Sequence, residues 1–321
     1  MKILVTGGAG FIGSNYILSH MQKYPKDKIV NLDKLTYAGN LNNLKWIEKD
    51  GNYSFIKGDI CNKKTAAKAM KGCDAVINFA AESHVDRSIK NPGEFIETDV
   101  FGTFVLLEEA KKQKISKFIQ ISTDEVYGSI AKGSFTEQSV LNPRNPYSAS
   151  KAGADRLAYS YSQTYDLNVS IARPSNNFGP LQYPEKLIPF FVTNLLQGEK
   201  VPVYGDGKNI RDWLFVYDNC EAIDLILRKG KKGEAYNIAG ENEKTNLWTT
   251  NFMLDCFGFG KEKIEYVKDR LGHDRRYSMK AEKIKKLGWK PKGKFEDKLD
   301  FTIQWYVENS WWWKPLLKKK K

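Results

Sequence analysis

The chain has 321 residues, of which 41% are hydrophobic, and its formal net charge at pH 7 is +13. No apolar stretch approaches the roughly 20 residues of a membrane span, and the N-terminus enters directly on KILVT, without a signal-peptide pattern. Four cysteines without a C-x-x-C pair and three scattered histidines predict neither a disulfide framework nor a metal site, so we expect a metal-free, cytoplasmic protein.

Positive charge is spread along most of the chain, because Lys and Arg alternate with Asp and Glu. The exception is the run KKKK at 318–321. This pattern favours a solvated surface over a nucleic-acid or membrane partner, and a small anionic substrate would also benefit from the field. A non-catalytic NAD-binding protein or a nucleic-acid binder stays open as the remote alternative.

Strand-like and helical patterns alternate through the first half of the chain. The strands are short and continuously apolar, as strands covered on both faces are, and amphipathic stretches at 94–113 and 147–165 have helical length. The expected strands are 2–6, 28–33, 54–59, 75–80, 117–122 and 168–173. This alternation predicts an α/β fold with a doubly wound parallel (Rossmann) sheet and a second, smaller α/β substrate domain.

The pattern changes after Arg173, where segments become irregular and richer in Pro and Gly. We expect a first domain at 1–172 and a second, smaller domain at 173–321, with part of 210–240 returning to the first sheet. Helices of the second half are expected at 185–198, 218–229, 246–257 and 295–309.

The segment VTGGAGFIG follows the first strand and has the spacing of a phosphate-binding turn. Gly7, Gly10 and Gly13 permit a tight turn and a close approach of the backbone to a pyrophosphate. Phe11 and Ile12 belong to the same turn, and the helix that starts there offers free N–H groups. The helix is expected to stop before Pro25.

Acidic and small residues at the ends of the next strands complete a dinucleotide site. Asp33 ends the second strand, where a carboxylate can hold both ribose hydroxyls and repel a 2′-phosphate, so the expected cofactor is NAD. Asp59 and Ile60 follow the third strand as adenine neighbours, although Asp59 could instead cap a helix. Ala80 and Ala81 follow the fourth strand and are expected to contact the cofactor.

Three further groups of polar residues follow in chain order. Ser83 and His84, just beyond the fourth strand, could face cofactor or sugar. STDEVYG places Asp124 and Glu125 side by side after the fifth strand, a position that needs a reason other than solvation.

NPYSASKAGADRL starts a helix, with Asn145 as its N-cap and Pro146 as its first residue. Tyr147 and Lys151 then share one helix face. A nearby ammonium group and a cationic nicotinamide would favour the tyrosine phenolate.

This combination resembles the extended short-chain dehydrogenase/reductase family. The resemblance implies that Tyr147 is the catalytic base, Lys151 its modulator, and Thr123 a binder of the same substrate hydroxyl. Such a trio supports hydride transfer at an alcohol carbon, whereas elimination of water needs a second acid–base pair. Asp124 and Glu125 supply that pair.

With this pair the chain is similar to the dTDP-glucose 4,6-dehydratase family over its whole length. The motifs are VTGGAGFIGSN, LDKLTYAGN, NFAAESHVDRSI, STDEVYG, NPYSASKA, NNFGPLQYPEKLIP, GDGKNIRDWLFVYDN, GHDRRY and WWWKPL. The resemblance implies conversion of dTDP-glucose to dTDP-4-keto-6-deoxyglucose and water. Glu125 would remove the carbon-5 proton, and Asp124 would donate to the departing 6-hydroxyl.

A sugar nucleotide also requires groups that bind its diphosphate and base. Amides, cations and a ring platform are expected at Asn176, Asn177, Lys186, Leu187, Tyr204, Arg211, Arg270 and His273. Phe178 and Leu271 depart from the family pattern, which leaves a UDP-linked substrate open.

The alternative enzymes are another sugar-nucleotide 4,6-dehydratase or a 4-epimerase, which would share Tyr147 and Lys151. A homodimer through helices 94–113 and 147–165 is expected, because the family commonly pairs in that way.

Overall fold

The computed structural model describes residues 1–318. The last three lysines of the run at 318–321 lie outside the described residues. No helix among residues 1–318 combines the length and the apolar character that crossing a membrane requires.

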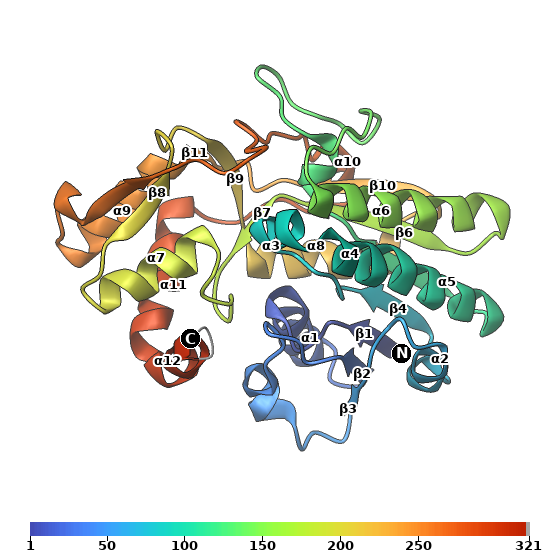
Figure 1. The fold of residues 1–321 in the computed structure, drawn as a ribbon. Helices are drawn as coiled ribbons and strands as arrows, with labels where there is room; N and C mark the ends of the chain where they lie inside the picture. The colour runs from blue at the N-terminus through green and yellow to red at the C-terminus, as the bar shows by residue number, and fades with distance from the viewer. Residues whose placement is uncertain (319–321) are drawn as a thin grey trace.

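A seven-stranded parallel sheet forms the centre of the fold, with strand order β10-β6-β5-β4-β1-β2-β3 (Figure 1). The strands are β1 (Lys2–Thr6), β2 (Lys28–Asp33), β3 (Tyr53–Lys57), β4 (Ala75–Asn78), β5 (Lys117–Ile121), β6 (Val169–Pro174) and β10 (Glu234–Ile238). From β1 the strands are added first on one side, as β2 and β3, and then on the other side, as β4, β5 and β6. Doubly wound folds bind ligands at this switch in strand order. The predicted fold class is confirmed.

Two hydrophobic cores lie on the two faces of this sheet. One contains apolar side chains of α1 (Phe11–Lys23) and α8 (Val216–Lys229). The other is built against three helices, which are α2 (Lys63–Met70), α5 (Gly102–Lys112) and α6 (Pro146–Thr164). Short helices α3 (Val85–Lys90) and α4 (Pro92–Phe95) and a π-helical turn, η2 (Ile96–Phe101), lead into α5.

A second group of elements packs around a third core, on the left in Figure 1. It has a three-stranded sheet, β11-β9-β7, and a parallel pair, β12-β8. The strands are β7 (Asn176–Phe178), β8 (Val201–Tyr204), β9 (Ile210–Phe215), β11 (Glu243–Thr245) and β12 (Ile264–Val267). The helices of this group are α7 (Leu187–Leu196), α9 (Asn246–Phe257), α11 (Phe295–Glu308) and α12 (Ser310–Lys318), with the 3-10 helix η4 (Lys261–Lys263). The short helix α10 (Glu282–Lys285) and the 3-10 helices η1 (Leu41–Ile47) and η3 (Asp124–Tyr127) contribute to the core that contains α1 and α8.

Although it follows β9 in sequence, β10 pairs with β6 at the edge of the large sheet, and α8 packs on that sheet. The division of the chain at residue 172 stays a prediction.

Local sequence explains where the helices that carry the site begin. The Asn145 side chain accepts from the backbone N–H of Ser148 at 2.9 Å, and the Ser148 hydroxyl in turn accepts from the Asn145 N–H, so the predicted cap of α6 is confirmed as a capping box. Helix α1 ends at Lys23, before Pro25.

Candidate active site

A cavity of about 760 Å³ lies at the carboxyl ends of the parallel strands, between the two groups of elements. Loops that leave β1, β2, β4, β5 and β6 meet there, because parallel strands end at the same edge of a sheet. Every predicted site residue lines this cavity: Gly7, Gly10, Phe11, Ile12, Gly13, Asp33, Asp59, Ile60, Ala80, Ala81, Ser83, His84, Thr123, Asp124, Glu125, Tyr147, Lys151, Asn176, Asn177, Lys186, Leu187, Tyr204, Arg211, Arg270 and His273. Lining is a statement of position, and the individual binding roles stay predictions.

The glycine turn after β1 fits a pyrophosphate. Gly7 has a φ of +68°, and a Cβ there would lie 2.6 Å from the Ala80 nitrogen. A Cβ on Gly13 would lie 2.4 Å from the Gly7 carbonyl oxygen. Helix α1 starts with Gly10 at its cap and no side-chain cap bond, so its first N–H groups stay available to an anion.

Asp33 fits the expected ribose contact. Its carboxylate accepts hydrogen bonds from the backbone N–H groups of Ala9 at 2.9 Å and Leu35 at 2.8 Å, which fixes it at the cavity wall. Each oxygen keeps a lone pair for a hydroxyl donor. Burial raises the pKa of this carboxyl, against the two backbone hydrogen bonds.

Asp59 pairs with Lys34 at 2.7 Å and accepts from the Cys61 N–H. It does not cap the following helix, because Asn62 caps α2.

Tyr147 and Lys151 share the buried face of α6, and the Lys151 ammonium donates to the Ile121 carbonyl at 2.7 Å. The expected lowering of the Tyr147 pKa depends on a bound cationic nicotinamide as well as on Lys151, and it stays a prediction. Burial raises this pKa well above its ordinary value, and the nearby carboxylates Glu125 and Asp99 raise it further. Because Lys151 points at a backbone carbonyl, the phenolate requires further positive charge in the cavity.

Asp124 and Glu125 are buried cavity residues, with exposures of 4% and 9%. They open the short helix η3, and the Thr123 side chain caps it by accepting from the Glu125 N–H. Burial raises the pKa of Asp124 well above its usual range, and the Glu125 charge adds to this. Asp124 is therefore suited to hold a proton and donate it.

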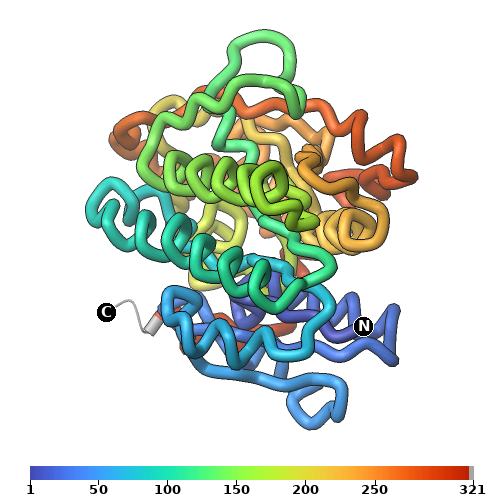
Figure 2. Tube along the Cα trace, turned by 90° about the vertical axis from the view of Figure 1, so that its right-hand side faces the viewer, coloured from blue at the N-terminus to red at the C-terminus, as the bar shows by residue number. Residues whose placement is uncertain are grey.

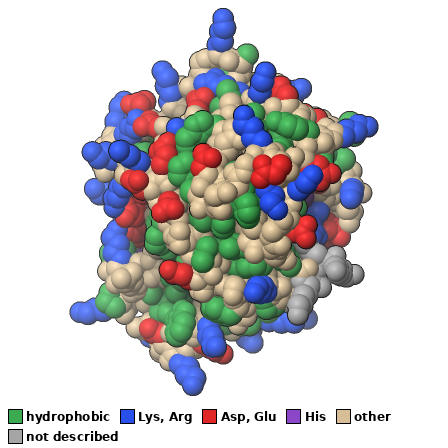
Figure 3. Space-filling view, turned by 90° about the vertical axis from the view of Figure 1, so that its left-hand side faces the viewer, with side chains coloured by type: hydrophobic (Ala, Val, Ile, Leu, Met, Phe, Trp, Pro, Cys, Tyr) green, Lys and Arg blue, Asp and Glu red, His purple; other side chains and the backbone are tan. Residues whose placement is uncertain are grey.

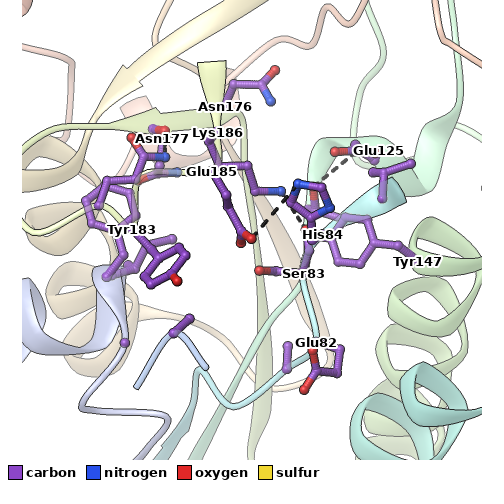
Figure 4. A pocket seen from close by; sticks show the side chains of 18 of the residues that line it. Glu82, Ser83, His84, Glu125, Tyr147, Asn176, Asn177, Tyr183, Glu185 and Lys186 are labelled. Carbon is purple, nitrogen blue, oxygen red and sulfur yellow. Dashed lines mark hydrogen bonds and ion pairs between the residues drawn. The ribbon is translucent and has the colours of Figure 1, made fainter. Parts of the chain in front are cut away.

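Glu125 has a partner that the sequence did not predict. The Tyr277 hydroxyl lies 3.3 Å from Glu125 Oε2 and 2.8 Å from Asp274 Oδ2, and its one proton can be donated to either carboxylate. Figure 4 shows Glu125 and Tyr147 on one side of the pocket, with Asn177 and Tyr183 on the other. The GHDRRY motif contains Tyr277, but nothing in its spacing places this ring beside residue 125.

A buried ion pair joins the turn that carries the acids to the helix that carries Tyr147. Arg173 donates to Asp155 of α6 at 2.8 and 2.9 Å, and to the Tyr127 hydroxyl of η3 at 2.6 Å. The Tyr127 hydroxyl donates onward to Asn237 at 2.7 Å. Burial raises the Asp155 pKa, but the bond to Arg173 outweighs it and the pKa is lowered. These contacts fix η3 relative to α6.

Several polar atoms of residues that line the cavity have no protein partner among the described residues. Arg270 Nε, Asn176 Oδ1 and His84 Nδ1 are buried and make no hydrogen bond among the described residues. Unpaired buried polar atoms cost free energy, so a ligand that completes them is expected. Arg211 is already engaged by the carbonyls of Ile210 and Asp274 and stacks on Tyr277.

The remaining predicted substrate residues lie in pairs. Tyr204 and His273 are in edge contact at 6.2 Å between ring centroids, and His273 Nδ1 lies 2.6 Å from Asp269. Lys186 donates to the Ser83 carbonyl at 2.6 Å, which joins two predicted residues from distant segments.

A contact between loops links the cofactor side of the cavity to the nucleotide side. Tyr37, in the loop after β2, donates to Glu185 Oε1 at 2.8 Å. The Arg87 guanidinium lies 3.5 Å from the centre of the Tyr37 ring and 3.8 Å from the Glu185 carboxylate. Sequence analysis missed Glu185, although it precedes the predicted Lys186.

Two more acids were missed beneath the nicotinamide side. Asp99, in η2, accepts from the Ser150 hydroxyl at 2.6 Å and from the Glu82 N–H at 2.9 Å. Burial raises the Asp99 pKa to about 6 despite the neighbouring Lys151. Burial and the Asp99 charge raise the Glu82 pKa to about 7.

The two departures from the family pattern do not line the cavity themselves. Phe178 is buried in the third core against Trp213, which does line the cavity, and Leu271 is 75% exposed beside Arg270. Their effect on the choice between dTDP and UDP stays a prediction.

The chain is similar to known proteins over nearly its whole length. The family described as GDP-mannose 4,6 dehydratase matches residues 4–301. The low-salt glycan biosynthesis protein Agl12 of Haloferax volcanii is 50% identical, over 96% of this chain and 99% of that protein. The dTDP-glucose 4,6-dehydratase of Streptomyces antibioticus is 48% identical, over 99% of this chain and 96% of that protein.

Solved structures show the same likeness. DesIV, a dTDP-glucose 4,6-dehydratase from Streptomyces venezuelae solved with NAD bound, is 48% identical with a TM-score of 0.96, over 98% of this chain and all of that one. The UDP-glucose 4-epimerase of Thermus thermophilus, also solved with NAD, is 27% identical with a TM-score of 0.89, over 96% of this chain and 99% of that one. The chain therefore belongs to the dTDP-glucose 4,6-dehydratase family, a group of NAD-dependent hydro-lyases within the extended short-chain dehydrogenase/reductases.

Proposed function

We propose that this protein converts dTDP-glucose to dTDP-4-keto-6-deoxyglucose and water. The observation that carries the proposal is that Asp124 and Glu125 are buried in the same cavity as Tyr147 and Lys151. Oxidation of an alcohol needs only Tyr147 and Lys151. Elimination of water also needs a second acid–base pair, which Asp124 and Glu125 can supply.

The residues for NAD fit that cofactor, because the Gly7–Gly13 turn admits a pyrophosphate and Asp33 is fixed at the end of β2. When bound, NAD supplies the hydride acceptor for carbon 4 and the hydride donor for carbon 6. The positive nicotinamide adds the charge that lowers the Tyr147 pKa.

Tyr147 removes the proton from the 4-hydroxyl, and Thr123 holds that hydroxyl in place. The carbon-4 ketone then acidifies the hydrogen on carbon 5. Glu125 takes this proton, and Asp124 donates its proton to the 6-hydroxyl, which leaves as water. Glu125 finally returns its proton to carbon 5.

Unpaired polar groups of the cavity would bind the nucleotide. Arg270 Nε and the side-chain N–H groups of Asn176 and Asn177 would donate to diphosphate oxygens, and Tyr204 is suited to stacking on the base. Arg211 would approach the diphosphate from the guanidinium edge that the Ile210 and Asp274 carbonyls leave open.

Incubation of the purified protein with dTDP-glucose, UDP-glucose and GDP-mannose tests the proposal. We expect dTDP-glucose to lose one water, seen by mass spectrometry, and to give the alkali-labile 4-keto product fastest. Formation of an epimerised hexose without the keto product would instead establish the 4-epimerase alternative. A faster reaction of UDP-glucose would move the protein to a UDP-linked 4,6-dehydratase.

A homodimer through α5 and α6 is part of the proposal. The two helices lie side by side on one face (Figure 2), and Ile96, Phe101, Tyr159 and Tyr165 are more than a third exposed around them. A second copy of this face would cover these side chains. Light scattering that gives the mass of one chain in dilute solution would contradict the dimer.

We also propose a cytoplasmic location without a nucleic-acid partner. All four cysteines are unpaired, as expected in a reducing compartment. On the face in Figure 3, Lys and Arg alternate with Asp and Glu and form no continuous basic patch. Retention of DNA at roughly 200 mM salt would contradict this, because non-specific phosphate binding weakens steeply with salt.

A further inference from the structure

The hydroxyl of Tyr277 joins two buried carboxyl groups. Its oxygen lies 2.8 Å from Asp274 Oδ2 and 3.3 Å from Glu125 Oε2, and all three side chains are buried. Burial and the Glu125 charge raise the pKa of Tyr277 well above its ordinary value, so the hydroxyl keeps its proton at neutral pH. A single proton therefore serves two competing acceptors.

Asp274 is held in place by contacts that do not involve Glu125. Its Oδ1 accepts from Arg144 Nη1 at 3.3 Å, and its backbone carbonyl accepts from Arg211 Nη2 at 3.0 Å and from Asn209 Nδ2 at 3.2 Å. Because Asp274 is fixed in this way and lies closer to the hydroxyl, it is the preferred acceptor of the Tyr277 proton.

The choice of acceptor matters for the removal of the carbon-5 proton. A hydrogen bond to an ionised carboxylate is roughly twice as strong as one between neutral groups. If Tyr277 donated to Glu125, this strong bond would be lost when Glu125 takes the proton, and the loss would add to the barrier. A hydroxyl that donates to Asp274 keeps its charged acceptor before and after the transfer.

We propose that Asp274 is a positioning residue for the carbon-5 proton transfer, because it accepts the Tyr277 hydrogen bond and leaves Glu125 free to take the proton. Asp274 is not among the residues that line the cavity, so it acts through Tyr277, which does line it. In this step the bond between carbon 5 and hydrogen breaks and Glu125 gains the proton. Tyr277 and Asp274 neither gain nor lose one. The proposal rests on the dehydratase function above.

Replacement Asp274→Asn tests the proposal, because it keeps the shape of the side chain and removes its charge. The Tyr277 proton should then go to Glu125, the remaining charged acceptor. We expect kcat of the holoenzyme with dTDP-glucose to fall by roughly 10- to 100-fold. The isotope effect on kcat from deuterium at carbon 5 should become larger than in the wild type, whereas that from deuterium at carbon 4 should not.

Replacement Arg144→Gln is the matched control. It removes the other side-chain partner of Asp274 and leaves the charge of Asp274 and the Tyr277 hydroxyl in place. We expect the kcat and the isotope effects of the wild type. A loss equal to that of Asp274→Asn would overturn the proposal, because the ion pair would then matter rather than the contact with Tyr277.

The same Asp274→Asn change in a Tyr277→Phe background separates this role from a merely structural one. Without the hydroxyl, loss of the Asp274 charge should cause no further fall in kcat, because the two residues act as a unit. An equal fall in both backgrounds, or an unchanged carbon-5 isotope effect in Asp274→Asn alone, would overturn the proposal. Asp274→Ser carries the same comparisons if the asparagine variant does not fold. Absence of keto product from the wild type is a different result, which would reject the proposed function itself.

Discussion

The hydroxyl of Tyr277 lies 3.3 Å from Glu125 Oε2, although the two residues are 152 positions apart in the sequence. The same hydroxyl lies 2.8 Å from Asp274 Oδ2, so its one proton is shared between the two carboxylates, and the Arg211 guanidinium lies 4.3 Å from the centre of its ring. Tyr277 is therefore placed to position the carboxylate that we assign as the carbon-5 base.

Replacement Tyr277→Phe should free the Glu125 carboxylate without removing the ring. A base displaced by about 1 Å can cost on the order of 10² in rate. We expect kcat to fall by that order, together with slower exchange of solvent deuterium into carbon 5 of the product, measured by mass spectrometry. An unchanged exchange rate would show that Tyr277 does not position Glu125.

Replacement Asp124→Asn should block the departure of the 6-hydroxyl and leave the oxidation at carbon 4 intact. An amide cannot supply the proton, so turnover should fall by roughly 10²–10⁴. Reduced nicotinamide should then accumulate and be visible by its near-ultraviolet absorbance. The matched control Glu125→Gln should instead suppress deuterium exchange at carbon 5, and identical behaviour of the two variants would contradict their separate roles.

The buried Asp99 should make stability depend on pH. Its pKa is raised from 3.8 to about 6, so the folded protein binds more protons than the unfolded chain between these values. The contribution of this group to the free energy of unfolding is therefore complete below pH 3.8. It falls by on the order of 3 kcal/mol as the pH rises through about 6. Asp99→Asn should flatten the urea-unfolding free energy between pH 4 and 6, and an equally steep slope in the variant would assign the effect elsewhere.

The contact between Tyr37 and Glu185 should slow the release of NAD. Tyr37→Phe removes the 2.8 Å hydrogen bond to the carboxylate and keeps the ring under Arg87. Loss of one hydrogen bond to a charged group should speed the loss of cofactor during gel filtration by roughly tenfold. Tyr53→Phe is the control, because that hydroxyl bonds Asn31 and does not line the cavity. Equal retention of NAD in both variants would show that the contact between Tyr37 and Glu185 does not slow cofactor release.

Asp155→Asn should destabilise the protein strongly. It leaves Arg173 buried at 1% exposure without its counter-charge, which typically costs about 3–5 kcal/mol in the free energy of unfolding. Asp166→Asn is the control, because the Asp166 side chain is 87% exposed in its pair with Lys232 and should matter by less than about 1 kcal/mol. Similar unfolding midpoints for the two variants would contradict the large contribution to stability that we assign to the buried pair.

Sequence analysis succeeded where local chemistry decides the structure. Continuous apolar runs became the parallel strands, and Asn145 and Pro146 began α6 as predicted, because caps and strand patterns act over a few residues. The site residues meet because the strand ends share one edge.

The sequence did not predict the features that depend on contacts between distant segments. Helix α12 contains Pro315, which local rules place outside helices, and it is held by Trp312 donating to Asn43 at 2.7 Å. Glu185, Tyr277 and Asp99 were missed because their partners Tyr37, Glu125 and Ser150 are distant in sequence. The sequence also did not show how strongly burial raises the Tyr147 pKa in the protein without ligands, where the Lys151 ammonium is bound to a carbonyl.

The contacts of Arg173 with Asp155 and Tyr127 fix the position of η3, while the proposed chemistry belongs to other side chains. Because these contacts fasten the acid-bearing turn to α6 from behind, neither Asp124 nor Glu125 contributes to holding the two together. Side chains at those two positions can therefore be replaced without loss of the contact that fixes η3 to α6.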